Sequence, residues 1–424
     1  MRPIASAWIA AASCLVLSLG LSAAARPHYG GTLRVEFHSA VSSLDPNEPA
    51  RDSEEYIAKS RLIPAVFETL VRINDRGEVE PWLATSWAHE PSRRRWVFTA
   101  RPGVLLQNGM PWNPPGGAVV VPDDKPIEQT LRTLAQPNSA IAVRGTDGSL
   151  YGTGPFRVVK WSPTEATLAA HENYWGGRPY LDAIELQFGR AVRDQTLDLE
   201  TGKAEAVEAA FTDLRRLAQK GLRTSMAAKP AITLALVFDN PRISPSLREA
   251  LGLAIDRGAI QSVLLQGGGE STGALLPRWL SGYSFVFPKT RDVVKAKLQA
   301  ASSGTLGFAF DRQDSVLRPI AERIAVNGNE AGITLRASSG PPDVSLVRLP
   351  VTANDEWAAL EGMAQALKIP LPSGLSPYEG EKALLENARV IPLFHLQESW
   401  AWSAQVRNWT GSWADIWIDS GEKQ

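Results

Sequence analysis

The sequence predicts an α/β protein that is built from two lobes. The chain has 424 residues, which is more than one hydrophobic core usually serves. Its second half alternates apolar runs of strand length with amphipathic helices. A strand at 306–310, a helix at 316–325 and a strand at 332–335 imply a parallel pair joined by a right-handed crossover. These observations predict α/β architecture in at least one of the lobes.

The first elements follow from short repeats in residue character. Leu33, Val35 and Phe37 alternate with polar residues, which predicts a strand. Apolar residues from Ile63 to Val71 recur at helical spacing, which predicts a helix. A turn at 74–77 and alternation over 96–101 predict a second strand, and Asn108-Gly109 is typical of a tight hairpin turn.

Later elements are expected from the same patterns. The stretch 113–124 is rich in Pro and Gly and is expected to be a loop. Gly152 and Gly154 could suggest a phosphate loop, but no Lys-Ser/Thr pair follows them, which excludes that motif. The remaining predicted elements are a helix starting at 127, helices at 197–207, 214–222, 246–257 and 292–300, and strands at 184–188, 232–238, 343–347 and 390–395.

Composition argues against several classes of function. Apolar residues make up 44% and charged residues 21%, and the net charge is -1. These values are ordinary for a globular protein and give no reason to expect nucleic acid or an anionic membrane as partner. The five histidines lack metal-ligand spacing, and no H-E-x-x-H motif occurs. We therefore expect a protein that is not an enzyme and has no cofactor and no metal site.

The N-terminus has the pattern of a secretory signal. Arg2 precedes an apolar run at 9–21, and small residues at 23–25 offer a cleavage site. We expect residues 1–25 to be a cleaved signal peptide and the mature protein to be periplasmic; the alternative is a retained anchor. Cys14, the only cysteine, lies within the apolar run. The mature chain would then contain neither disulfides nor thiolate metal sites.

The stretch from Glu68 to Pro111 resembles family 5 extracellular solute-binding proteins, the dipeptide, oligopeptide and nickel receptors of ABC importers. The matching blocks are E-T-L-V at 68–71, P-W-L-A-T-S-W at 81–87 and W-V-F-T-A-R-P-G-V at 96–104. Further similar segments are G-G-T-L-R-V at 30–35, L-D-P at 44–46, G-T-G-P-F at 152–156 and R-E-A-L-G-L-A-I-D-R at 248–257.

This resemblance implies a two-lobed, periplasmic-binding-protein-like fold of type II with a hinge. Lobe 1 is expected at 26–241 plus 389–424 and lobe 2 at 242–388, with chain crossings near 240–246 and 388–392. The family's small accessory domain is expected to be reduced, because the match breaks after Trp112. The implied function is that of a monomeric receptor, which captures a peptide or peptide-like solute between its lobes and delivers it to an ABC permease and its ATPase.

Ligand-contacting residues are expected at the cleft. In peptide-binding members, the strand that matches 236–238 contributes contacts, which points to Val237 and Phe238. His38 is expected on the first strand near the cleft loop, as a polar residue beside Val35 and Phe37, with a surface or hydrogen-bonded histidine as the alternative. Trp112 could present an aromatic face or belong to a core. The full set of candidates is Phe37, His38, Trp112, Val237, Phe238 and Trp400.

One family feature is missing from the sequence. Peptide-binding members anchor the peptide ammonium with an Asp in a W-x-A-D-Y segment, but here residues 348–353 read R-L-P-V-T-A. A buried ammonium without a carboxylate partner costs several kcal/mol. Ordinary peptide binding is therefore in question, and a degenerate paralogue with a non-transport interaction or sensory role is the alternative function.

Overall fold

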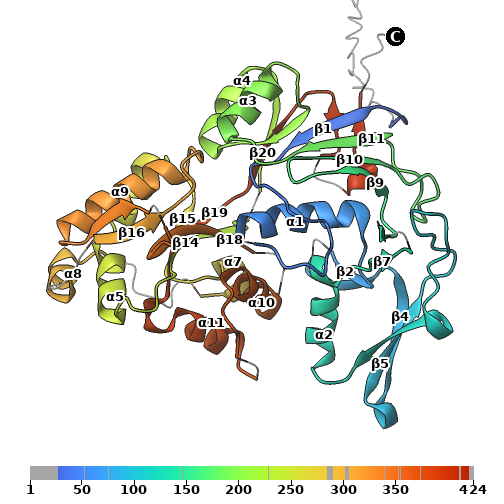
Figure 1. The fold of residues 1–424 in the computed structure, drawn as a ribbon, viewed down its shortest axis with the longest axis horizontal. Helices are drawn as coiled ribbons and strands as arrows, with labels where there is room; N and C mark the ends of the chain where they lie inside the picture. Colours follow the sequence, from blue (N-terminus) through green and yellow to red (C-terminus); the bar gives the residue numbers. More distant parts are fainter. Residues whose placement is uncertain are drawn as a thin grey trace, which may run out of the picture.

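The computed structural model describes residues 27–419 apart from 52, 75, 147, 228, 284–289, 301–304, 339, 352, 354, 373 and 410–411. The signal peptide expected at 1–25 lies outside the described residues. Within these ranges, no helix combines the length and the apolar character that crossing a bilayer requires. Two large sheets organise the chain, one in each lobe (Figure 1).

Lobe 1 is built around a seven-stranded sheet. Its central strand, β1 (Thr32–Glu36), runs parallel to β11 (Ala183–Gln187) on one side and β12 (Ala206–Glu208) on the other. The strand order is β13 (Arg223–Met226), β20 (Ser399–Trp402), β12, β1, β11, β10 (Glu165–Ala170) and β9 (Phe156–Trp161). The helices after this sheet's strands are α3 (Val192–Glu200) and α4 (Leu214–Gln219).

Lobe 2 is built around a six-stranded sheet. Its order is β15 (Glu270–Ser271), β19 (Val390–Leu396), β14 (Ile232–Phe238), β18 (Val344–Pro350), β16 (Thr305–Ala309) and β17 (Thr334–Ala337). β16 runs parallel to β17, which agrees with the crossover predicted for this region. Every residue of β14 and of β19 is buried.

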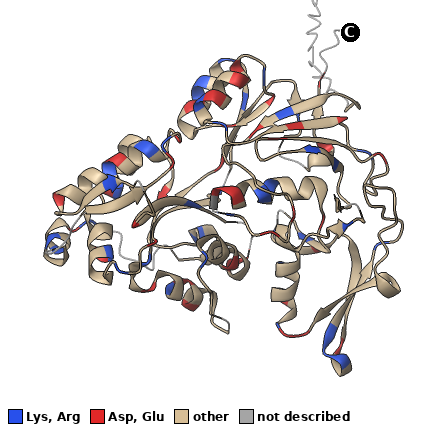
Figure 2. Ribbon diagram, in the orientation of Figure 1, with Lys and Arg blue, Asp and Glu red and all other residues tan. Residues whose placement is uncertain are grey.

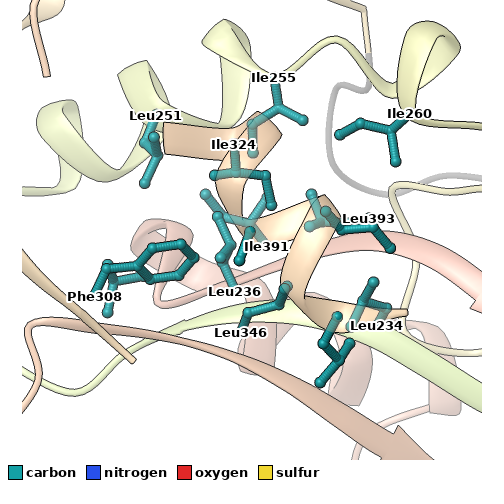
Figure 3. Close-up of a cluster of buried hydrophobic side chains, with 14 of the residues drawn as sticks. Leu234, Leu236, Leu251, Ile255, Ile260, Phe308, Ile324, Leu346, Ile391 and Leu393 are labelled. Atoms are coloured by element: carbon teal, nitrogen blue, oxygen red, sulfur yellow. The ribbon is translucent and has the colours of Figure 1, made fainter. Parts of the chain in front are cut away.

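Helices cover both faces of the lobe 2 sheet. Leu234, Leu236 and Phe238 point to a core shared with α5 (Pro245–Ala254) and α9 (Leu317–Glu330), and Figure 3 shows the centre of this core. Ala235 and Val237 point to the opposite core, beside α10 (Glu356–Leu367) and α11 (Pro377–Leu385). Among its described residues, lobe 2 also contains the α-helices α6 (Arg257–Ala259), α7 (Arg278–Ser281) and α8 (Val293–Gln299).

Two strands near the expected lobe boundary belong to the lobe 2 sheet. β14 pairs with β18 and β19 there, although the ranges expected for lobe 1, 26–241 and 389–424, include β14 and β19. The last strand of the lobe 1 sheet before β14 ends at Met226, and β20 of that sheet begins at Ser399. An apolar run that is buried on both faces fits the centre of either sheet, so its sequence does not identify its partners.

An accessory unit, residues 67–152, extends from lobe 1. It holds a hairpin of β2 (Val71–Ile73) and β3 (Val79–Pro81), and a sheet of β4 (Ala84–Glu90), β5 (Arg95–Ala100) and β6 (Ala118–Pro122). α2 (Ile127–Leu134) and the pair β7 (Val143–Arg144) and β8 (Leu150–Tyr151) complete it around its own hydrophobic core.

Three local expectations were wrong. The helix expected to reach Val71 ends at Val66, and Val71 begins β2. β6 forms within the stretch expected to be a loop, because Ala118 is followed by three valines whose branched side chains favour strands. Residues 206–208 form β12 instead of continuing a helix, because this segment pairs with both β1 and β20.

Helix α1 (Ser53–Val66) lies between the lobes (Figure 1). Ala58, Leu62 and Val66 bury one face of it in the core of lobe 1. The helix also contacts β18 of lobe 2. The first turn of α1 therefore faces the space between the two sheets.

Candidate functional site in the cleft between the lobes

Both lobes contribute walls to a cavity that we call the inner chamber. Its empty space, counting the open mouth, is about 770 Å³. Lobe 1 supplies charged residues from the ends of β1 and β12 and from α1, and lobe 2 supplies them from β18 and from the start of α9. These residues are His38, Glu54, Arg61, Glu208, Asp314 and Arg348. Figure 2 shows the acidic start of α1 at this position.

His38 connects the two lobes directly. Its Nε2 lies 2.5 Å from Oδ2 of Asp311 in lobe 2, and its Nδ1 lies 3.1 Å from the carbonyl oxygen of Arg190. Burial disfavours the charged imidazolium, but the hydrogen bond to Asp311 and the nearby carboxylates outweigh this effect. They raise the pKa of His38 to about 9. His38 and Asp311 therefore form an ion pair across the cleft at neutral pH.

The arginines of the inner chamber are already paired. Arg348 lies 2.5 Å from the carboxylate of Asp314, which also accepts hydrogen bonds from two backbone N–H groups at the start of α9. Arg61 forms an ion pair with Glu398, and its guanidinium lies 5.0 Å from the centre of the Trp400 ring. Both cations thus have fixed carboxylate partners.

Two carboxylates of the inner chamber, by contrast, are not part of an ion pair. Within the described part of the chain, neither Glu54 nor Glu208 has a cation close enough for a salt bridge. Oε2 of Glu208 accepts a hydrogen bond from the backbone N–H of His38 at 2.7 Å. Burial raises the pKa of Glu54 to about 7, against the opposing effect of Arg348.

A larger outer chamber adjoins the inner one, and Arg61 lines both. Its empty space is about 1560 Å³, open solvent included. Aromatic side chains from the accessory unit, from a turn of lobe 1 and from the C-terminal segment form much of its wall: Trp82, Tyr174, Trp409 and Trp413. The Arg72 guanidinium stacks 3.8 Å from the centre of the Trp82 ring and pairs with Glu80. The outer chamber is thus aromatic, and its cations are also paired.

The expected ligand residues occupy different places. His38 and Trp400 line the inner chamber, and Phe37 is fully buried behind Trp400, with ring centres 5.5 Å apart. Val237 and Phe238 lie in the two cores of lobe 2, because β14 is a central strand covered on both faces. Trp112 packs in the core of the accessory unit. The structure therefore brings Phe37, His38 and Trp400 together and keeps the other three apart from them.

Most charged residues of the inner chamber were not predicted from the sequence. Arg348 carried a usable signal, because a charged residue interrupts the apolar strand V-S-L-V-R-L-P. Glu54, Glu208 and Asp314 carried none, since each is an ordinary polar residue near the end of an element, and Arg61 is an ordinary polar residue within α1. Among the described residues, no group of three or more His, Cys, Asp or Glu side chains is placed to hold a metal ion.

Comparison with protein families gives one match that spans more than half of the chain. The profile of the bacterial extracellular solute-binding proteins, family 5 (middle region), matches residues 119–364. The probable D,D-dipeptide-binding periplasmic protein DdpA of Escherichia coli is 22% identical, over 74% of this chain and 74% of its own. The nickel-binding periplasmic protein of the same organism is 23% identical, over 63% of this chain and 61% of its own. The uncharacterized protein YhjP of Bacillus subtilis is 29% identical, over 35% of this chain and only 30% of its own.

Solved structures share the fold. NikA from Staphylococcus aureus, in complex with Ni(L-His)2, has a TM-score of 0.77 at 15% identity, over 91% of this chain and 98% of its own. The oligopeptide-binding protein AppA from Bacillus subtilis, in complex with a nonapeptide, has a TM-score of 0.76 at 15% identity, over 93% and 100%. These likenesses confirm the two-lobed fold. Together with the family profile they establish that the chain belongs to the bacterial extracellular solute-binding proteins of family 5.

Proposed function

We propose that this protein is the periplasmic substrate-binding component of an ABC importer. It captures a small solute, a peptide or peptide-like compound, between its lobes and delivers it to the permease, which works with an ATPase. Export would use the signal peptide expected at 1–25, and the protein would act as a monomer. Family membership supports the class of function, and the ligands of its relatives, from nickel to peptides, support a small solute.

The observation that carries this proposal is the shared construction of the inner chamber. Its walls come from β1, β12 and α1 on one side and from β18 and the start of α9 on the other. A chamber of this kind is complete only while the lobes are closed. Ligand binding would therefore favour the closed form, and the permease would distinguish it from the open form.

The missing anchoring Asp favours a second candidate function. Val351 and Ala353 line the outer chamber where the W-x-A-D-Y segment of peptide-binding members is expected. A paralogue that has lost solute capture would serve as a non-transport interaction or sensory protein. It would keep the fold of the family without a bound solute.

Native mass spectrometry of the mature protein from the periplasm tests the choice. We expect a bound small molecule that disappears after denaturation and refolding. We also expect a rise in Tm when a peptide or a related solute is added back. A clean unliganded mass, together with no thermal shift from peptides, amino acids and metal chelates, would contradict the receptor function and favour the paralogue.

A further inference from the structure

The cationic side chains that line the two chambers are all paired with carboxylates, which disfavours an anionic ligand. Every arginine that lines them has a carboxylate partner: Arg61 with Glu398, Arg72 with Glu80 and Arg348 with Asp314. His38 is paired with Asp311. Within the described residues, an anionic ligand would have to displace one of these internal partners. Breaking a buried ion pair leaves an uncompensated charge and is costly.

The inner chamber contains two carboxylates in excess. Glu54 projects from the first turn of α1, and Glu208 from the end of β12, and both line the cavity. The charge of Glu208 contributes to the raised pKa of Glu54, which places the two groups within electrostatic reach of each other. No hydrogen bond to the Glu54 carboxylate occurs among the described residues. A positive group that enters the chamber would find these two carboxylates available.

From this charge balance, and on the basis of the proposed function, we propose that the solute is a cation whose ammonium or guanidinium group lies in the inner chamber between Glu54 and Glu208. Charge-assisted hydrogen bonds to two carboxylates would hold this group in place. The body of the solute would extend past Arg61 into the outer chamber. There the side chains of Trp409 and Trp413 favour apolar and aromatic groups.

The raised pKa of Glu54 adds a consequence for binding. Without a ligand, burial keeps the Glu54 carboxyl partly protonated near neutral pH. A bound cation favours the ionised form, so binding would release protons from the protein. The affinity would consequently fall as the pH is lowered below the pKa of Glu54.

Ion-exchange fractions of yeast extract provide the test. The low-molecular-mass portion is separated into cationic, neutral and anionic fractions, and each is added to the mature protein in a thermal-shift assay. We expect the cationic fraction to raise Tm, and the compound bound from it to carry a basic group. A shift caused only by the neutral or the anionic fraction would overturn this inference but leave the receptor function standing. A shift from none of the three would contradict both.

Charge-neutral variants then locate the basic group. Glu54→Gln and Glu208→Gln should each weaken the affinity for the purified compound by about tenfold or more. Glu322→Gln is the matched control, because Glu322 is an exposed glutamate on α9 of lobe 2 with a side chain that is 61% exposed. Unchanged affinity in both chamber variants would overturn the assignment.

A second readout does not depend on the folding of any variant. The affinity of the wild-type protein for the purified compound is measured by calorimetry between about pH 5 and pH 8, in buffers with different ionisation enthalpies. We expect weaker binding towards the acid end and proton release near neutral pH. Affinity that is independent of pH, without proton release, would contradict the role of Glu54.

Discussion

Glu68 is a buried carboxylate that organises the wall of the outer chamber. It accepts hydrogen bonds from the indole N–H groups of Trp82 and Trp175, both at 2.8 Å, and from the hydroxyls of Tyr174 at 2.7 Å and Thr153 at 2.8 Å. Burial raises the pKa of Glu68, although these donors act in the opposite direction. The glutamate of the E-T-L-V block therefore joins residues from the accessory unit to a turn of lobe 1.

We predict that Glu68→Gln destabilises the protein. The amide would place an N–H₂ group against donors, and at least one buried donor would lose its partner. The expected loss is about 3 kcal/mol in the free energy of unfolding. Urea unfolding of the variant measures it. Glu128→Gln, at an exposed glutamate of α2, should change stability by less than about 0.5 kcal/mol. Equal stability of the two variants would contradict this role for Glu68.

The candidate site shows which residues a sequence can identify. His38 was predicted because it is a polar residue beside Phe37 on an alternating strand, and Trp400 was also among the expected ligand residues. Glu208 and Asp314 could not be predicted, because their importance arises from the approach of α1, β12 and α9 across the cleft. For Trp112 the sequence allowed either a ligand-facing or a core position, and its neighbours in the accessory unit place it in a core.

At the level of elements, the turn at 152–154 packs directly on the end of α1. A Cβ atom added to Gly152 would lie 2.0 Å from the carbonyl oxygen of Val66. The backbone N–H of Gly154 donates a hydrogen bond of 3.0 Å to the same oxygen. The G-T-G-P segment, which does not fit a phosphate loop, is thus required for a close approach of two backbones.

Gly152→Ala should therefore be strongly destabilising. The methyl group can be accommodated only if the turn or the end of α1 shifts, and we expect a loss of about 3 kcal/mol or more. Gly340→Ala is the matched control, because a Cβ atom there meets nothing within 4 Å. Thermal unfolding of both variants checks the prediction. If Gly152→Ala is as stable as the control, the contact does not constrain the fold.

Local patterns predicted most elements, whereas the pairing of strands was harder to predict. Alternation identified β1 and β5, and a continuous apolar run identified β14. The segment that forms β12 has apolar residues at helical spacing, and its strand conformation depends on neighbours far away in the sequence. The same limitation explains why β14 and β19 were expected within lobe 1, although both pair within the lobe 2 sheet.

At the level of the whole molecule, polar contacts hold the lobes together. Besides the ion pair of His38 and Asp311, Arg132 of α2 lies 3.0 Å from the carboxylate of Asp355 at the start of α10. The ammonium of Lys368 donates a hydrogen bond of 2.7 Å to the carbonyl oxygen of Arg51. The closed arrangement therefore depends on charges that can separate and hydrate when the lobes open. This is typical of an interface that must open reversibly.

The ion pair across the cleft should make closure depend on pH. The pKa of His38 is raised from 6.5 to about 9, so its stabilisation of the closed form is complete below pH 6.5 and is lost as the pH rises through 9. The pKa of Asp311 is lowered from 3.8 to about 2, so its contribution is present above pH 3.8 and is lost as the pH falls towards 2. The closed form should therefore be most favoured between these limits and should open at alkaline pH.

Small-angle X-ray scattering of the unliganded protein at about pH 6 and about pH 9.5 measures this change as an increase in the radius of gyration. His38→Gln should reduce the increase and shift the population towards the open form already at the lower pH. His89→Gln is the control, because His89 pairs with Asp123 at 2.6 Å within the accessory unit and does not bridge the lobes. A response identical to that of the wild type would show that the lobes close without help from His38.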